Sequence, residues 1–280
     1  MNDAGKPVQA AQQLIAAVAR VLAAGAVAAL ATVVDAPRGV GAKLLIEQTG
    51  GRAGTTGDAA LDDALTTHAQ TFLTLRAEAQ TFNVAELAPH LTAWRGARVL
   101  FERIEPEPHV VVCGAGHVGA ALARLAHVVG YRVTLIDDRA DFVTRERFPE
   151  TEINLVAAHD GWARAIQTVL GTGRGVYVAV VTRGHNEDEE CLRAVLTARP
   201  DYVGMIGSKR RTNIVLARLR ETGVNEENLK EVRAPVGLDI GAVAPEEVAL
   251  AILAEIVAAR RGGTGAPLSA WRRGNKSSDE

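Results

Sequence analysis

HVVVCGAGHVGAALARLAHVVGYRVTLIDD, residues 109–138, decides the fold of this chain. It opens with an apolar run, VVVC (110–113), whose composition is typical of a strand that is buried on both faces. Glycines in G-x-G-x-x-G spacing follow, then a helical pattern, and then a second apolar run that ends at Asp137. Strand, glycines, helix, strand and acid in this order predict a nucleotide-binding βαβ unit.

Each of the three glycines has a mechanical role in such a unit. Gly114 permits a tight turn, Gly116 lets the backbone approach a phosphate, and Gly119 lets the helix pack closely on the strand. The free N–H groups and the dipole at the helix N-terminus then favour an anion. Asp137 occupies the place where a Rossmann unit holds a ribose, so a dinucleotide is one candidate ligand. His117 is expected to face either that ligand or the backbone of its own loop.

The bulk composition limits the class of protein. With 280 residues the chain can form two modest domains, and 48% hydrophobic with only 4% aromatic residues suits α/β layers. A formal net charge of −2 argues against a nucleic-acid partner. The 2 cysteines form neither a metal-binding spacing nor a disulfide framework, so we expect a reducing compartment and no bound zinc.

The apolar N-terminal stretch, residues 8–34, could be mistaken for a membrane or targeting segment. Gln12, Gln13 and Arg20 interrupt it, and Gly25 stands where a helix would end. A helix followed by a buried strand explains it better than a membrane span, and it lacks the features of a signal peptide. We therefore expect a cytoplasmic protein without membrane contact.

The remaining pattern predicts two domains of α/β class. Residues 1–105 are expected to form a smaller N-terminal α/β domain, with helices at 8–24 and 59–78, strands at 27–34, 40–47 and 99–104, and a polar loop at 54–58. Asp58 is a plausible N-cap for the second helix. Pro106 and Pro108 end this domain. Residues 106–262 alternate strands with helices, which predicts a Rossmann-like doubly wound parallel sheet, and residues 263–280 are expected to be a disordered tail.

A second polar loop, TRGHN (182–186), follows a predicted strand at 176–181. Because ligands bind at the carboxyl ends of parallel strands, Arg183 is a candidate anion clamp. His185 is a candidate proton-transfer residue, with Asp188 as the carboxylate that orients it. The alternative is that Asn186 or Asp188 simply caps the next helix, predicted at 188–198, and that His185 is solvated.

A third loop, GSKRR (207–211), combines a helix cap with cations. Ser208 can cap the next helix while Lys209 and Arg210 face a phosphate, although three consecutive basic residues cannot all point one way. A fourth stretch, residues 233–241, contains Asp239 and has no regular period. It is either a plain connector or a lid over the site.

Taken together, these motifs resemble a known family. The C-terminal domain of the XdhC/CoxI proteins, accessory factors of xanthine dehydrogenase and related molybdenum hydroxylases, is similar to GAGHVG (114–119), TRGH (182–185), YVGMIGSKRR (202–211), APVGLDIGA (234–242) and PEEVALAILAEI (245–256). The N-terminal part, including LATVVDAPRGVGAKLLI (30–46), is similar more loosely. GTTGDAALDDAL (54–65) stands where the family has a glycine-rich segment with a cysteine, and Asp58 or Ala59 takes its place. The cysteine's role in holding molybdenum cofactor is therefore not carried over.

The resemblance implies a maturation chaperone without turnover of its own. Such a protein binds molybdenum cofactor (molybdopterin), aids its sulfuration with a cysteine desulfurase, and inserts it into a xanthine dehydrogenase-type client; we also expect a homodimer. Phosphate-cradling loops and Arg or Lys donors suit molybdopterin. The alternative is an NAD(P)-dependent oxidoreductase with Asp137 on the ribose and His185 as proton donor. A third possibility is a nucleotide-sensing module without chemistry.

Overall fold

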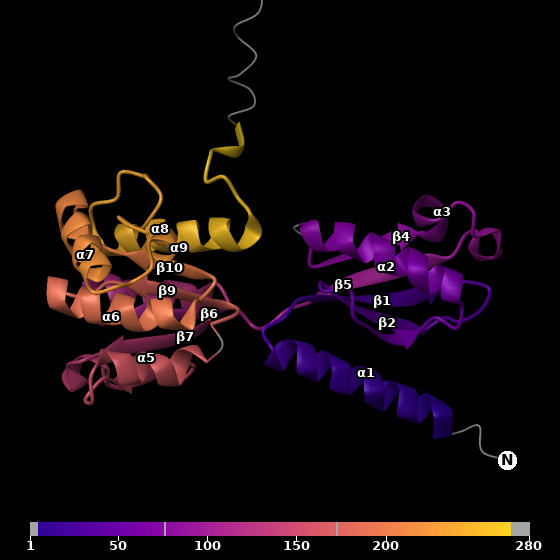
Figure 1. The fold of residues 1–280 in the computed structure, drawn as a ribbon, viewed down its shortest axis with the longest axis horizontal. Helices are drawn as coiled ribbons and strands as arrows, with labels where there is room; N and C mark the ends of the chain where they lie inside the picture. The colour runs from indigo at the N-terminus through magenta and orange to yellow at the C-terminus, as the bar shows by residue number, and fades with distance from the viewer. Residues whose placement is uncertain (1–4, 76, 172, 270–280) are drawn as a thin grey trace, which may run out of the picture. The chain divides into compact units, whose positions relative to one another are not determined.

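The computed structural model describes residues 5–75, 77–171 and 173–269, and the chain divides into two compact units, residues 1–106 and 107–280 (Figure 1). Of the tail that is predicted to be disordered, residues 270–280 lie outside the described residues. None of the helices formed by the described residues has both the length and the apolar character that crossing a membrane requires.

The N-terminal unit is an antiparallel sheet between two helices. Its strand order is β3-β2-β1-β5-β4, with bounds β1 (Ala28–Asp35), β2 (Lys43–Glu47), β3 (Arg52–Thr55), β4 (Ala79–Asn83) and β5 (Arg98–Ile104). Alternate side chains point to opposite faces: Ala28 and Leu45 pack with α1 (Gly5–Ala23), whereas Ala29 and Leu44 pack with α2 (Ala59–Thr74). The short helices α3 (Val84–Leu87) and η1 (Thr92–Trp94) join β4 to β5.

Two predictions for this unit were wrong. The helix expected to reach Glu78 ends at Thr74, and residues 79–83 form β4 against β5. The loop expected at 54–58 begins inside β3, which pairs with β2. In both places, hydrogen bonding to a neighbouring strand decides the local structure, and such pairing cannot be read from local periodicity.

The C-terminal unit has a six-stranded sheet in which every pair is parallel. The order β8-β7-β6-β9-β10-β11 is the strand order of a Rossmann fold, which confirms the predicted doubly wound sheet. The strands are β6 (His109–Cys113), β7 (Arg132–Asp137), β8 (Ile153–Ala157), β9 (Val176–Val180), β10 (Tyr202–Met205) and β11 (Val232–Arg233). We refer to this part of the chain as the Rossmann unit.

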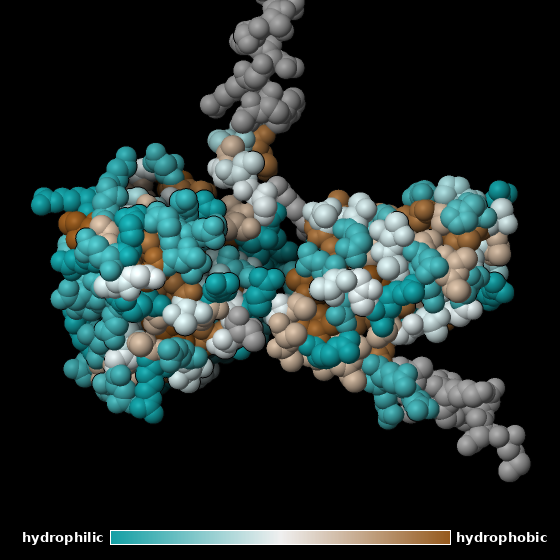
Figure 2. Space-filling model, viewed as in Figure 1, coloured by the Kyte–Doolittle hydropathy of each residue, from teal (hydrophilic) through white to brown (hydrophobic). Residues whose placement is uncertain are grey.

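Helices cover both faces of the parallel sheet. One core lies under α4 (His117–Val128) and α9 (Pro245–Arg261), and the other lies under α5 (Trp162–Leu170), α6 (His185–Ala198) and α7 (Lys209–Glu221) (Figure 1). The connectors η2 (Ala140–Phe142) and α8 (Glu226–Lys230) complete the unit. The face of this unit that Figure 2 shows is mainly hydrophilic, as expected when the apolar side chains are buried between helices and sheet.

Candidate functional site

The crevice of a doubly wound sheet lies where the strand order reverses, and here that point is between β6 and β9. The chain leaves β6 toward β7 on one side, and it leaves β9 toward β10 on the other. The glycine loop after β6 and the loop at 182–184 after β9 therefore meet at the same edge of the sheet. They are in close contact, because a Cβ atom on Gly114 would lie 2.6 Å from the Val181 carbonyl oxygen.

The geometry of the glycine loop agrees with the roles expected from its spacing. Gly114 has φ +117°, a conformation that side-chain-bearing residues rarely adopt. A Cβ on Gly119 would lie 1.8 Å from the Gly114 carbonyl oxygen, so only glycine lets α4 pack this closely on the loop. At Gly116, in contrast, a Cβ would meet nothing within 4 Å. The backbone at Gly116 is therefore open to an incoming group.

Two helix N-termini at the crevice lack a side-chain cap. Gly116 is the N-cap of α4 and Gly184 is the N-cap of α6, and neither helix receives a side-chain hydrogen bond at its cap. The neighbouring helices α5, α7 and α9 each have a side-chain acceptor at this end, namely Glu190, Ser208 and Glu247. The N–H groups of α4 thus remain available to an anion at the reversal point of the sheet, whereas at α6 the Glu187 carboxylate lies against Gly184 without capping the helix.

Asp137 is committed to holding the glycine loop. Its carboxylate is 1% exposed and accepts a hydrogen bond from the Ala115 backbone N–H at 2.7 Å. The Arg139 guanidinium contacts both carboxylate oxygens, at 2.9 and 3.0 Å, and the Arg139 N–H adds a further bond. The carboxylate that was predicted to bind a ribose thus already accepts its hydrogen bonds from groups of the protein itself.

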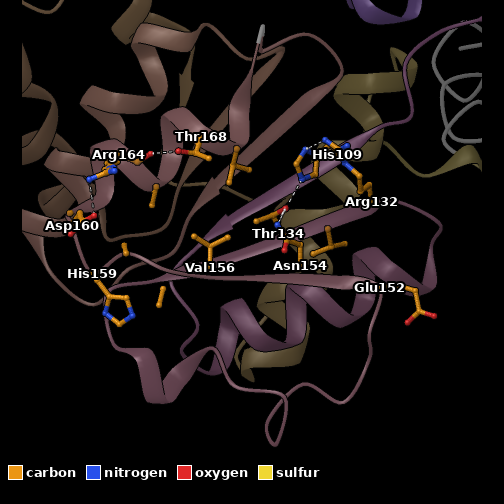
Figure 3. A pocket seen from close by; sticks show the side chains of 16 residues that line it. His109, Arg132, Thr134, Glu152, Asn154, Val156, His159, Asp160, Arg164 and Thr168 are labelled. Carbon is orange, nitrogen blue, oxygen red and sulfur yellow. Dashed lines mark hydrogen bonds and ion pairs between the residues drawn. The ribbon is translucent and has the colours of Figure 1, made fainter. Parts of the chain in front are cut away.

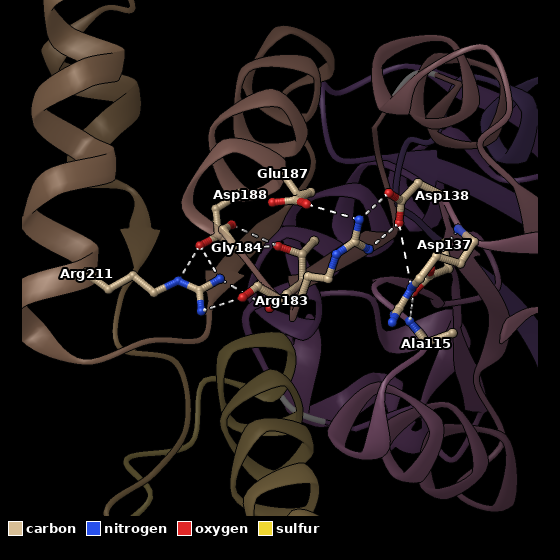
Figure 4. Close-up of polar contacts among 10 residues, drawn as sticks. Ala115, Asp137, Asp138, Arg183, Gly184, Glu187, Asp188 and Arg211 are labelled. Carbon is tan, nitrogen blue, oxygen red and sulfur yellow. Dashed lines mark hydrogen bonds and ion pairs between the residues drawn. The ribbon is translucent and has the colours of Figure 1, made fainter.

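Arg183 reaches across the crevice to Asp138. Its guanidinium donates to both Asp138 carboxylate oxygens, at 2.7 and 2.8 Å, and lies 3.2 Å from Glu187 (Figure 4). The guanidinium lowers the pKa of the Asp138 carboxyl below its usual value, and the Asp138 carboxylate in turn raises the pKa of Arg183. The residue predicted to clamp an anion therefore holds a carboxylate of its own chain.

Asp188 is fully buried and ties the loop after β9 to α7. It accepts from the Thr182 hydroxyl at 2.5 Å and from Arg211 Nε at 2.6 Å, and Arg211 also donates to the Thr182 carbonyl at 3.2 Å (Figure 4). Burial raises the pKa of the Asp188 carboxyl, against the lowering effect of the bonds from Thr182 and Arg211. The prediction missed Arg211; the signal for it was a buried acid that needs a counter-ion.

The predicted catalytic pair is not brought together by a hydrogen bond. His185 is exposed as the first residue of α6, which begins there and not at Asp188. The Asp188 carboxylate contacts Thr182 and Arg211 instead. This arrangement makes Asp188 a buried structural anchor, while His185 lies at the uncapped end of α6.

The other predicted ligand-binding residues lie on the surface. His117 is the exposed first residue of α4. Ser208 caps α7 by accepting from the Arg211 N–H, as predicted, and both Lys209 and Arg210 are exposed in the first turn of that helix. Their side chains are thus accessible to a ligand at the carboxyl end of β10.

The stretch at 233–241 is anchored at its centre. Backbone hydrogen bonds join Val236 to Met205 and Leu238 to Ala251, and the Gly237 N–H donates to the Glu255 carboxylate of α9. Asp239 follows this anchor and is exposed. The stretch therefore contains both a fixed connector and an exposed end.

A separate hollow of ≈ 630 Å³ lies over β6, β7 and β8 beside α5 (Figure 3). His109, Arg132, Thr134 and Asn154 line one end of it and form a chain of hydrogen bonds. Arg132 donates to His109 Nδ1 at 2.7 Å, so Nε2 carries the proton that is shared with the Thr134 hydroxyl at 2.9 Å. Burial, together with the Arg132 charge, lowers the pKa of His109 to about 4. A neutral imidazole is thus built into the sheet.

In the N-terminal unit, Asp58 caps α2, as predicted. Its carboxylate accepts from the backbone N–H groups of Ala60 and Leu61, from Trp94 Nε1 at 2.9 Å and from Arg38 at 3.3 Å. The hydrogen bond from Trp94 is the main reason that the pKa of Asp58 is lowered. Asp58, which with Ala59 is one of the two residues expected where the resembling family has a cysteine, therefore has its hydrogen-bond partners within this unit.

The chain is similar to several proteins over parts of their length. It is 33% identical over 158 residues to the uncharacterized protein YqeB of Escherichia coli (56% of this chain, 28% of the relative). It is 28% identical over 163 residues to a Bacillus subtilis protein named as a probable subunit of xanthine dehydrogenase (58% of this chain, 46% of the relative). It is 36% identical over 84 residues to the E. coli molybdenum cofactor insertion chaperone PaoD (29% of this chain, 26% of the relative). The chain thus spans less than half the length of these relatives.

A solved structure shares the fold over nearly the whole chain. It is described as a xanthine dehydrogenase from Bacillus halodurans, with TM-score 0.50 and 18% identity, over 92% of this chain and 98% of the other. The sequence model of the XdhC Rossmann domain matches residues 110–256, and that of the XdhC and CoxI family matches residues 21–83. These matches, over both the glycine loop and the N-terminal unit, show that the chain belongs to the XdhC/CoxI family.

Proposed function

We propose that this protein is an accessory factor that binds molybdenum cofactor and assists its insertion into a xanthine dehydrogenase-type molybdenum hydroxylase. Family membership supports this proposal, as do a relative named as a molybdenum cofactor insertion chaperone and another named as part of a xanthine dehydrogenase. On this proposal the protein acts as a cytoplasmic carrier, as a homodimer, and its partners are the client enzyme and a cysteine desulfurase.

One observation carries the assignment of a ligand site: the uncapped N-termini of α4 and α6 converge where the sheet order reverses. Molybdopterin carries a terminal phosphate, and such a group is matched by free N–H groups beside an open glycine. The groups that would hold it are the backbone at Gly116 and the first turns of α4 and α6, with His117 and His185 at their ends. Ser208, Lys209, Arg210 and Asp239 complete the candidate site.

The metal end of the cofactor finds no thiolate on this chain. The sequence has 2 cysteines, Cys113 and Cys191, and both are buried in the core of the Rossmann unit. Burial raises the pKa of Cys191 well above its usual value, which suppresses the reactive thiolate. We therefore infer that this chain supplies no thiolate to the metal end of the cofactor, and that any sulfur passes from the desulfurase to the cofactor without a relay on this chain.

An NAD(P)-dependent oxidoreductase receives less support from the geometry. In that function Asp137 would hold the ribose, yet its carboxylate is already bonded to Ala115 and Arg139. A ligand that needed Asp137 would have to break these bonds at a nearly inaccessible site.

The experiment is a titration of the purified full-length protein with molybdenum cofactor, with its dephosphorylated form and with NADH. We expect micromolar or tighter binding of the intact cofactor, weaker binding of the form without phosphate, and weak binding of NADH. Gly116→Val should remove cofactor binding, because the side chain would fill the open space beside the backbone.

Ala163→Val, at an exposed position of α5, is the matched control and should bind as the wild type does. NADH binding that is tighter than cofactor binding, and that Asp137→Ala removes, would refute the proposal. Equal affinity for the phosphorylated and dephosphorylated forms would place the ligand elsewhere.

A further inference from the structure

The ion pair between Arg183 and Asp138 spans the mouth of the crevice. Arg183 follows β9 and Asp138 follows β7, and β6 lies between these two strands in the sheet. A contact of 2.7 Å between their side chains must therefore pass over the carboxyl end of β6, where the glycine loop begins. Figure 4 shows Arg183 extended toward Asp138, with Asp137 and Ala115 close by.

The charges around this bridge are unevenly matched. Asp137 is paired with Arg139, and Asp188 is paired with Arg211. Asp138 and Glu187 both contact the guanidinium of Arg183, and Asp138 also lies 4.0 Å from Arg139 Nε. The Arg183 guanidinium is thus held by two carboxylates, and an anionic ligand that approaches it meets their negative charges unless Arg183 turns toward the ligand.

We propose that Asp138 is a built-in competitor for the anionic group of the ligand, and that Arg183 exchanges Asp138 for that group when the ligand binds. This inference rests on the proposed anion site at the glycine loop. The bridge is suited to exchange because the Arg183 side chain is 47% exposed and that of Asp138 is 28% exposed, so water can solvate each partner as it leaves.

An internal competitor suits a protein that must give up its cargo. When the ligand leaves, Arg183 regains Asp138, so the free protein is stabilised and release is favoured. The same pair keeps the crevice closed to weakly bound anions. Affinity is thereby held below what two open helix N-termini and a free arginine would provide.

The test uses inorganic pyrophosphate and purified molybdenum cofactor as probes on the full-length protein, with calorimetry as the readout. Asp138→Asn removes the competitor, and both probes should bind about fivefold to tenfold more tightly. Arg183→Met should weaken both by about tenfold. Glu226→Gln is the matched control, because it breaks another exposed bidentate pair, with Arg220 outside the crevice, and should leave both affinities unchanged.

The outcomes separate this inference from the proposed function. If the wild type binds the probes and Asp138→Asn does not bind them more tightly, the ion pair between Arg183 and Asp138 does not open on binding and the exchange is refuted. If neither the wild type nor Asp138→Asn binds either probe, the anion site itself is wrong and both proposals fail. Binding by Asp138→Asn alone supports the exchange. Melting curves confirm that each variant is folded.

Discussion

His109 should make the Rossmann unit lose stability as the pH falls from about 6.5 to 4. The imidazole is 3% exposed, and the Arg132 guanidinium donates to its Nδ1 at 2.7 Å, so a proton at that nitrogen would face a cation without solvent. These surroundings lower the pKa of His109 from 6.5 to about 4. Between these two pH values, His109 is protonated in the unfolded chain but stays neutral in the folded protein. Lowering the pH within this range therefore lowers the free energy of unfolding.

The size of the effect follows from the two pKa values. One pKa unit is equivalent to about 1.4 kcal/mol, so the full difference is about 3 kcal/mol below pH 4. Between pH 7.5 and pH 5, where the unfolded imidazole is almost fully protonated, the free energy of unfolding should fall by about 2 kcal/mol through His109 alone. The matched variant is His109→Gln, because its amide can accept from Arg132 and donate to Thr134 but cannot titrate.

Urea denaturation of both proteins at pH 7.5 and pH 5, followed by circular dichroism, measures this difference. Subtracting the variant from the wild type removes contributions from other groups, including His68, whose pKa burial also lowers. We expect His109→Gln to lack about 2 kcal/mol of the pH dependence of the wild type. If both proteins lose stability equally, His109 titrates normally in the folded state and the reasoning from burial and Arg132 is wrong.

Four further substitutions probe the glycine loop, Asp137 and the cap of α2. Gly119→Ala should lower the free energy of unfolding, measured with urea, by about 3 kcal/mol, because its Cβ would lie 1.8 Å from a backbone oxygen. Gly116→Ala should be as stable as the wild type and should weaken pyrophosphate binding about tenfold. Equal stability of the two variants would contradict the packing argument. Asp137→Asn should cost about 3 kcal/mol, because the amide lacks the negative charge and places an NH2 group against either Arg139 or the Ala115 N–H; an unchanged urea midpoint would contradict this role of Asp137. Asp58→Ala should lower the urea midpoint, because α2 loses its N-cap and the Trp94 indole N–H loses its acceptor; an unchanged midpoint would contradict both roles.

Much of the fold was readable from the sequence because the Rossmann unit is locally consistent. Apolar runs, glycine spacing and capping residues all favoured the same strands and helices, so the parallel sheet followed. The sheet of the N-terminal unit was less readable. β4 is formed by AQTFN, a stretch whose pairing with β5 depends on a strand almost twenty residues further along the chain.

The sequence predicted where the candidate loops lie in the sheet, but not their side-chain contacts. The loops after β6 and β9 were expected at one edge of the sheet, and they do meet there. Which cation pairs with which acid was not predictable, because such pairs join residues 23 to 45 positions apart, as in Arg211 with Asp188 and Arg183 with Asp138. Motif spacing identifies a carboxylate at Asp137, but it cannot show that this carboxylate already accepts a hydrogen bond from the protein's own backbone.

The two units differ in what the N-termini of α2 and α4 offer to an anion. At α2 the N-terminus is neutralised by Asp58, whose carboxylate Trp94 and Arg38 also hold. At α4 no side chain plays that part, and the adjacent acid, Asp137, is turned to Ala115 instead. Because a second carboxylate or phosphate at α2 would meet a negative charge, an anionic ligand is favoured at α4. Of these two helices, α4 therefore has the N-terminus that is more open to an anion.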